Sequence, residues 1–275
     1  MNSPKSMRTN HVKELLRRGE PALGAWLNLP STTSARVMAR LGFDWLLIDM
    51  EHSAHNPSLM AEMVATVADA GTCAPFVRIP YNSVEWFKWA LDAGAWGVLV
   101  PMVNTREEAE SVVSNSKYPP AGTRSVGGAF APYAFGTLDR NAYLQGANDE
   151  ILVAVQIESA QGLQNVDSIL SVPGLDVAFV GPNDLHASLG LPPSVYSAQP
   201  AFLDALERIK TAAKQYHIAT GIMSSDGAAA AERVREGFQM VTATTDLNSM
   251  ISGATQNIST ARAKPDVHPE RPAGY

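Results

Sequence analysis

The sequence of 275 residues contains one cysteine, Cys73, and no long uninterrupted apolar run. A single cysteine excludes an intramolecular disulfide and a cysteine-based zinc site, which is typical of a reducing compartment. We expect Cys73 to be a small buried side chain. No apolar run approaches the roughly 20 residues of a membrane helix, and the polar start MNSPKSMRTN lacks the apolar core of a signal peptide. We therefore expect a cytoplasmic protein with no membrane partner.

An excess of basic charge is also missing. The chain has 21 basic and 27 acidic side chains, so its formal net charge is −6. A weakly acidic chain lacks the excess of basic side chains that attracts nucleic acid, so we expect no nucleic-acid partner. The sequence also lacks a GxSxG nucleophile elbow and a P-loop.

Lysine is absent from the apolar segments that we predict as strands. An aldolase that works through a Schiff base needs a buried strand lysine with a lowered pKa. The lysines fall instead in predicted helices or near the termini, at Lys5, Lys13, Lys88, Lys117, Lys210, Lys214 and Lys264. This distribution argues against a Schiff-base mechanism.

Short apolar runs alternate about eight times with longer helical stretches, and Gly, Pro, Ser or Asp marks each switch. Runs that are apolar on both faces indicate a parallel sheet covered by helices. The strands are expected at 22–29, 45–50, 75–80, 97–103, 151–158, 176–182, 218–224 and 240–245. Eight such units favour an α/β fold, a single (β/α)8 TIM barrel, over two doubly wound domains.

Three segments do not follow this alternation of strands and helices. Residues 1–21 are expected to form an N-terminal segment with a short helix on the barrel floor, ahead of a barrel domain over 22–263. The Gly- and Pro-rich stretch 118–136 is expected to form a loop over the active face. The proline-rich residues 264–275 are expected to be a flexible tail.

Polar residues gather at the carboxyl ends of the predicted strands, where TIM barrels place their active sites. They are Asp49, Glu51, His52, Arg78, Gln156, Glu158, Asn183 and Asp184. At three other strand ends, Asn28, Asn104 and Asp246 are expected to cap the following helices.

The carboxylates of Glu158 and Asp184 end adjacent strands and can converge. Such a pair either shares a proton or binds a cation, and an oxygen-rich site favours Mg²⁺ or Mn²⁺. Alternatively, both residues cap helices. Gln156 and Glu158 are two residues apart, so both point into the barrel, where polar side chains need partners.

Arg78 requires an anionic partner within an apolar strand. That partner is either Asp49 or Glu51, or else a substrate carboxylate or oxyanion. His52 is the natural general base, oriented by Asp49, although a lone histidine is often structural. We expect His55 to be a loop or helix-start residue without a catalytic role.

The segment VGPNDL (180–185) is expected to begin a short helix whose free N–H groups form an anion site. Two residues past Asp184, His186 lines the pocket or caps this helix. Together with Arg78, the backbone amides would suit a small oxo acid.

Seven ordered blocks resemble the HpcH/HpaI family of metal-dependent class II pyruvate aldolases. They are LGAWLNLPS, FDWLLIDMEHS, PFVRIP, ALDAGAWGVLVPMV, GTRSVGG, VQIES and VAFVGPNDL, between about residues 22 and 262. Members of this family include 4-hydroxy-2-oxoheptanedioate aldolase and macrophomate synthase. Met50, Ser159 and the 129–140 loop differ from the heptanedioate enzymes, so the resemblance does not identify the aldehyde that is released.

The resemblance implies a role for each site residue. Glu158 and Asp184 would bind a divalent cation, most simply Mg²⁺, with Mn²⁺ or Co²⁺ as alternatives. Arg78 would stabilise an enolate oxygen, while Gln156 and the backbone amides of Asn183 and Asp184 would hold the oxo acid. His52 with Asp49 would be the acid/base. Glu51 would lie close to metal-bound water. Asp92 would either join the site from a neighbouring subunit or simply end a helix.

The resemblance also implies the reaction and the assembly. The expected reaction is reversible cleavage of a 4-hydroxy-2-oxo acid to pyruvate and an aldehyde through a metal-bound pyruvate enolate. Oxaloacetate decarboxylation, as in macrophomate synthase, is the alternative, and a non-catalytic oxo-acid-binding barrel is an alternative of another class. Family members form hexamers, as trimers of dimers, by exchanging C-terminal helices, and residues 247–263 match that helix in position.

Overall fold

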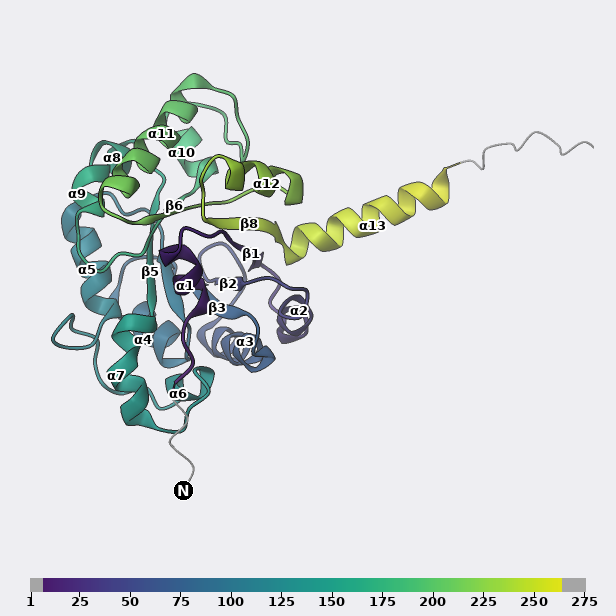
Figure 1. The fold of residues 1–275 in the computed structure, drawn as a ribbon. Coiled ribbons are helices and arrows are strands. Elements are labelled where there is room, and N and C mark those ends of the chain that lie inside the picture. The colour runs from purple at the N-terminus through teal and green to yellow at the C-terminus, as the bar shows by residue number, and fades with distance from the viewer. Residues whose placement is uncertain (1–6, 264–275) are drawn as a thin grey trace, which may run out of the picture.

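The computed structural model describes residues 7–263, so the tail predicted over 264–275 lies outside the described residues. Eight parallel strands form a closed barrel in sequence order, with β8 pairing with β1. The strands are β1 (Ala22–Leu27), β2 (Trp45–Asp49), β3 (Ala74–Arg78), β4 (Gly97–Val100), β5 (Leu152–Ile157), β6 (Val177–Val180), β7 (Ala219–Ile222) and β8 (Met240–Thr245). This confirms the predicted (β/α)8 barrel, as Figure 1 shows.

Most of the helices follow strands and cover the outside of the barrel, whereas α1 precedes β1 and α13 projects away from the barrel. They are α1 (His11–Arg17), α2 (Thr32–Met38), α3 (Pro57–Ala70), α4 (Val84–Asp92), α5 (Arg106–Ser116), α6 (Ala131–Ala134), α7 (Arg140–Glu150), α8 (Ala160–Gln164), α9 (Val166–Leu170), α10 (Pro182–Ser188), α11 (Pro200–Gln215), α12 (Gly227–Arg235) and α13 (Asp246–Arg262). None of the helices within residues 7–263 has both the length and the apolarity to span a membrane.

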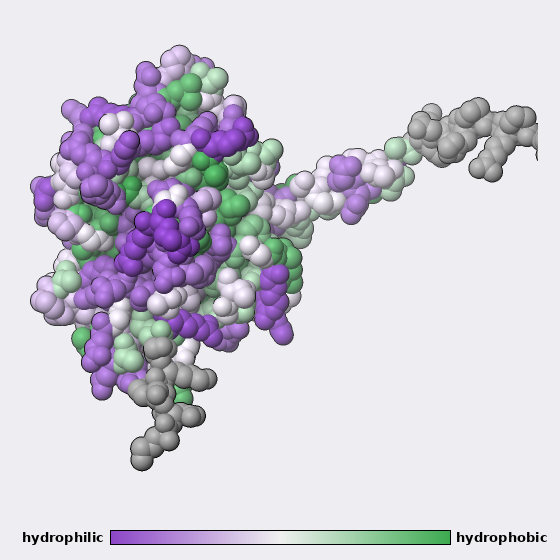
Figure 2. Space-filling model, viewed as in Figure 1, coloured by the Kyte–Doolittle hydropathy of each residue, from purple (hydrophilic) through white to green (hydrophobic). Residues whose placement is uncertain are grey.

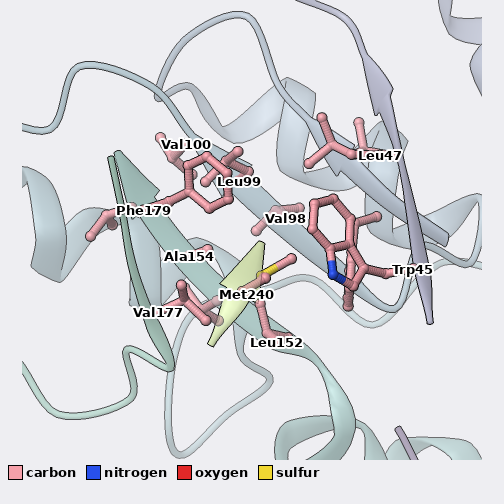
Figure 3. Packing of buried hydrophobic residues seen from close by; sticks show 14 of the residues in the cluster. Trp45, Leu47, Val98, Leu99, Val100, Leu152, Ala154, Val177, Phe179 and Met240 are labelled. Carbon is pink, nitrogen blue, oxygen red and sulfur yellow. The ribbon is translucent and has the colours of Figure 1, made fainter. Parts of the chain in front are cut away.

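The barrel interior is filled by apolar side chains, several of which are drawn in Figure 3. Trp45, Phe76 and Phe179 have exposed fractions of 1% or less. Trp45 fits because Gly24 faces it from β1, where an added Cβ would come within 2.0 Å of the indole. Alternating large and small residues allow parallel strands to close around a packed core rather than a pore.

The predicted floor helix is α1, which spans the amino ends of the strands. Its N-cap, Asn10, accepts hydrogen bonds from the backbone N–H groups of Val12 and Lys13. The Asn10 amide also donates to the carbonyl oxygens of Trp96 at 3.0 Å and Glu150 at 2.8 Å. One side chain thus starts the helix and fixes it below β4 and β5.

The segment 118–136 does not lie over the active face, so that prediction is wrong. Its Phe135 ring stacks on Trp96 at 5.0 Å, immediately before β4 begins. The Phe135 carbonyl accepts the N–H of Arg8, ahead of α1. The segment follows α5 and leads to β5, and a connection from helix to strand lies at the amino ends of a barrel, opposite the active face.

Cys73 is buried, as predicted, with an exposed fraction of 2%. Burial raises the pKa of its thiol to about 12. At neutral pH the side chain is therefore an inert thiol rather than a nucleophile.

Candidate active site

A cavity of about 210 Å³ opens at the carboxyl ends of the strands. The structure brings seven of the predicted site residues together around it: Asp49, His52, Arg78, Gln156, Glu158, Asn183 and Asp184. Glu51 contacts this set through Arg78. Asp92 does not line this cavity but ends α4, where its carboxylate accepts a hydrogen bond from Arg124 at 3.0 Å.

Arg78 and Asp49 form a bidentate ion pair in one wall of the cavity. They are opposite each other in the register of β3 and β2. Arg78 Nε and Nη2 donate to the two Asp49 oxygens, each at 2.8 Å. Burial alone would raise the pKa of Asp49, but Arg78 and the backbone N–H groups of Glu51 and His52 hold that pKa below its ordinary value.

Two further contacts fix the guanidinium of Arg78. Its Nη1 lies 2.9 Å from Glu51 Oε2. Its plane lies over the Trp26 ring, with Cζ at 4.3 Å from the ring centroid. Trp26 in turn donates from Nε1 to Thr242 Oγ1 at 2.9 Å. Arg78 is therefore oriented before any ligand arrives. Trp26 and Thr242, which help to orient it, carry no mark of this role in the sequence.

The predicted pairing of Asp49 with the His52 imidazole does not occur. Asp49 Oδ1 accepts the backbone N–H of His52 at 3.3 Å, while its two oxygens are held by Arg78. The His52 ring lies 3.8 Å from Glu51 Oε1, and its side chain is 64% exposed. Arg78 outcompetes the imidazole for Asp49 because the strand register holds its guanidinium in the bidentate geometry. His52 is thus a largely exposed side chain at the cavity mouth.

His55 contacts backbone carbonyls rather than the cavity. Its Nδ1 lies 2.7 Å from the Asp49 oxygen and its Nε2 lies 3.2 Å from the Leu29 oxygen. The ring therefore links the loops after β1 and β2. His186, in contrast, is fully buried, with Nδ1 2.6 Å from the Pro182 carbonyl oxygen and its ring stacked on Phe202.

Glu158 is the most perturbed carboxyl group of the cavity. It is 3% exposed, and it accepts the Met102 N–H at 2.8 Å and Gln156 Nε2 at 2.6 Å. Burial, together with the negative charges of Asp184 and Glu51, raises the pKa of Glu158 to about 7. A carboxyl group in this state gains strongly from a nearby cation.

Two backbone features make room for Glu158. Met102 has φ of 53°, a left-handed conformation that is uncommon for a non-glycine residue, and it aims its N–H at Glu158 Oε1. An added Cβ on Gly181 would lie 1.8 Å from Glu158 Oε2. Neither residue was expected from the sequence, although the Gly-Pro pair of VGPNDL indicates a close approach of the backbone.

The donor set suits a hard divalent cation. Asp184 is the third residue of α10, whose N-cap Gly181 provides no side-chain hydrogen bond. Gln156 Oε1 is buried without a hydrogen-bond partner among the described residues. Within residues 7–263 no group of three or more His, Cys, Asp or Glu side chains is placed to hold a metal. The chain would thus supply two carboxylates and leave other positions to water and substrate oxygens, as Mg²⁺ prefers.

The three predicted helix caps are wrong, one by three residues and two by a single residue. The caps of α2, α5 and α13 are Ser31, Thr105 and Thr245. Asn28 instead donates to Asp49 Oδ2 at 3.2 Å in the cavity wall. Asn104 accepts from Ser159, and Asp246 accepts the N–H of Asn28. Hydroxyl side chains take the cap positions, which leaves the longer polar side chains to join neighbouring loops.

A closed parallel barrel that gathers a buried arginine and two carboxylates in one cavity at its carboxyl rim has the form of an enzyme active site. The chain belongs to the HpcH/HpaI aldolase/citrate lyase family, whose pattern matches residues 22–253. This confirms the resemblance found in the sequence.

Known proteins of this family are similar to the chain over most of its length. The hydroxypyruvate/pyruvate aldolase of Rhizorhabdus wittichii is 37% identical over 92% of this chain and 99% of its own. The 4-hydroxy-2-oxovalerate aldolase of Rhodococcus jostii is 40% identical over 78% of this chain and 82% of its own. The crystal structure of a family protein from Burkholderia cenocepacia superposes with a TM-score of 0.86 at 36% identity, covering 93% of this chain and 100% of that one.

The ion pair between Asp49 and Arg78 yields a stability prediction. Replacing Asp49 with Asn should lower the free energy of unfolding by about 3 kcal/mol at pH 7, because a buried guanidinium loses its bidentate partner. Because folding lowers the pKa of Asp49, this contribution is complete above the ordinary Asp range and is lost as the pH falls through the lowered pKa. Urea unfolding at several pH values measures the difference.

The exposed Asp69 of α3 provides the control, as Asp69→Asn. This substitution should change the unfolding free energy by less than about 0.5 kcal/mol. A loss in Asp49→Asn that matched this control at pH 7, or that persisted unchanged in strong acid, would contradict the prediction.

Proposed function

We propose that this protein is a divalent-metal-dependent aldolase that reversibly cleaves a 4-hydroxy-2-oxo acid to pyruvate and an aldehyde. One observation carries the proposal: a single cavity joins two carboxylates, Glu158 and Asp184, to the preoriented guanidinium of Arg78. A 2-oxo acid presents a carboxylate and a carbonyl oxygen, which match this combination of charges. The relatives named as aldolases of pyruvate and of 4-hydroxy-2-oxovalerate support the same chemistry.

The residues of the cavity suit the two ends of such a substrate. The backbone N–H groups of Asn183 and Asp184 lie in the first turn of α10 and would donate hydrogen bonds to the substrate carboxylate. Gln156 would hold the oxo acid from the floor of the cavity. Glu158 and Asp184 would hold Mg²⁺, or alternatively Mn²⁺ or Co²⁺. When bound, the cation supplies Lewis-acid polarisation of the substrate carbonyl.

His52 would begin the cleavage. From the cavity mouth its imidazole would take the proton of the C4 hydroxyl, and the C3–C4 bond then breaks as the aldehyde forms. The electron pair of that bond passes to the three-carbon fragment as an enolate, whose oxygen Arg78 stabilises. Protonation at C3 then gives pyruvate. Glu51, 3.8 Å from the His52 ring, would take the orienting role first expected for Asp49.

Removal of His52 separates this reaction from the decarboxylation of oxaloacetate. His52→Ala should lower kcat/KM for aldol cleavage by about 10³-fold, because the hydroxyl proton has no acceptor. Loss of CO₂ from oxaloacetate needs no such acceptor, so its rate should fall far less. Coupled pyruvate release measures both reactions, and His217→Asn, at an exposed position on the opposite end of the barrel, is the matched control.

Equal losses of the two activities in His52→Ala would contradict this role of His52. Failure of the wild-type protein to turn over any 4-hydroxy-2-oxo acid, with oxaloacetate consumed, would favour the decarboxylase alternative. No turnover of either class would favour an oxo-acid-binding barrel.

Metal binding is testable without activity. Titration of metal-free protein with Mn²⁺, followed by electron paramagnetic resonance, should show one site. Glu158→Gln and Asp184→Asn should each weaken it by at least about 10-fold, since each removes a charged ligand. Glu110→Gln, on an exposed carboxylate that pairs with Arg106, should leave it unchanged. Undiminished Mn²⁺ affinity in both site variants would contradict the assignment.

The C-terminal helix supports a proposal about assembly. All residues of α13 after Asp246 are exposed, and Figure 1 shows the helix projecting away from the barrel. One face of it carries Leu247, Met250, Ile251 and Ile258, each at least 36% exposed. Meanwhile the barrel exposes Leu23 of β1, and Val37 and Leu41 on and beside α2. We propose that two copies exchange α13 to cover these surfaces, in a dimer that builds the expected hexamer.

Such an exchange predicts that the apolar face of α13 controls the oligomer. Ile251→Glu with Ile258→Glu should shift the mass seen by light scattering to that of a monomer, because charges would have to be buried against apolar surface. Gln256→Glu, on the opposite face, should keep the wild-type mass. A monomeric wild type, or an unchanged mass in the double variant, would contradict the exchange. Asp92 would serve a neighbour's cavity only in the assembled protein.

A further inference from the structure

A second cluster of charged side chains lies on the floor of the barrel, opposite the active site. Lys13 of α1 and Lys117, just after α5, are only 4% and 5% exposed. Both ammonium groups donate to one atom, the carbonyl oxygen of Ile151: Lys13 Nζ at 3.1 Å and Lys117 Nζ at 2.8 Å. Two buried like charges therefore converge on a single oxygen, which is unfavourable without compensating anions.

The nearest carboxylate is already engaged. Asp176 Oδ1 lies 2.9 Å from Lys13 Nζ, and Asp176 Oδ2 accepts the N–H of Val153 at 2.8 Å. Lys117 donates instead to neutral carbonyl oxygens, those of Ile151 and of Asn148 at 2.7 Å. An ammonium group has three N–H donors, so these two bonds leave Lys117 one more to offer.

Two hollows adjoin this cluster, with volumes of about 450 and 180 Å³. Lys13, Arg17 and Asp176 line both of them, and Lys117 and Asp149 line the larger. Arg17 is exposed on α1, over which Figure 2 shows hydrophilic side chains gathered. The charged groups facing the larger hollow are three cations, Lys13, Arg17 and Lys117, against two carboxylates, Asp149 and Asp176.

We propose that this floor cavity binds a small tetrahedral oxyanion, either inorganic phosphate or the phosphoryl group of a small metabolite. Lys13, Arg17 and Lys117 offer separate cationic donors, as an anion with several acceptor oxygens requires. The larger hollow has room for a phosphoryl group with a short organic chain. A bound anion would join α1 to the segments before β5 and β6, so it would stabilise the floor without touching the active site.

Calorimetric titration of the full-length, metal-free protein with inorganic phosphate tests the proposal. Phosphate should bind and raise the Tm, because a ligand of the folded state stabilises it. Arg17→Gln and Lys117→Met should each weaken binding about 10-fold or more, since each removes a charged partner. The matched control is Arg18→Gln, the next residue of the chain, whose guanidinium pairs with Glu20 at 2.8 Å. Arg17 is exposed, so its variant should fold even if Lys117→Met does not.

The pH dependence adds a second readout. Burial, with the charge of Lys13, lowers the pKa of Lys117 to about 8. Sulfate remains a dianion between pH 7 and 9, so any change in its affinity over that interval comes from the protein. Its affinity should fall as Lys117 loses its proton, and Lys117→Met should abolish this fall. Comparison with glycerol 3-phosphate distinguishes the two sources: tighter binding than phosphate indicates a phosphorylated metabolite, and equal binding indicates the free anion.

Absence of phosphate binding to the wild-type protein would overturn the proposal. So would wild-type phosphate affinity in both floor variants, which would place the anion elsewhere, for instance beside Arg78. Neither result depends on aldolase activity, so this test can fail while the proposed function stands.

Discussion

Closure of eight parallel strands into one barrel is the constraint on which the rest of the structure depends. Every strand runs in the same direction, so all the carboxyl ends meet at one rim and all the amino ends meet at the other. Residues far apart in sequence, such as Asp49, Arg78 and Glu158, are thereby brought to one cavity. The same closure gathers Lys13, Lys117 and Asp176 at the opposite rim.

The active rim separates two electrostatic environments within one small cavity. On one wall, Arg78 holds Asp49 as a carboxylate and is itself oriented by Glu51 and Trp26. On the other wall, Glu158 lies near Asp184 and carries a raised pKa. Such an arrangement preorganises positive charge where an oxyanion can develop, and it leaves negative charge where a cation can bind. The two walls therefore suit opposite ends of one small oxo acid.

The sequence predicted the fold well because the relevant signals are local. Apolar runs such as WLLID and VAFV read as buried strands wherever they occur, and their alternation with helical segments implies a parallel barrel. Seven of the proposed site residues could also be found in this way, since a strand end is visible in the sequence and its position on the rim follows from the fold. The helix caps and the 118–136 segment were misplaced, because their surroundings come from distant parts of the chain.

The sequence by itself determined the barrel, its family and the identities of the polar residues at its rim. Only the tertiary structure decided which of those residues pair. Asp49 binds Arg78 rather than the His52 ring because the register of β2 and β3 sets the two side chains opposite each other. Likewise, the close approach of Gly181 and the left-handed backbone of Met102 at Glu158 follow from the meeting of separate strands. A carboxylate has many chemically acceptable partners in a sequence, and geometry selects among them.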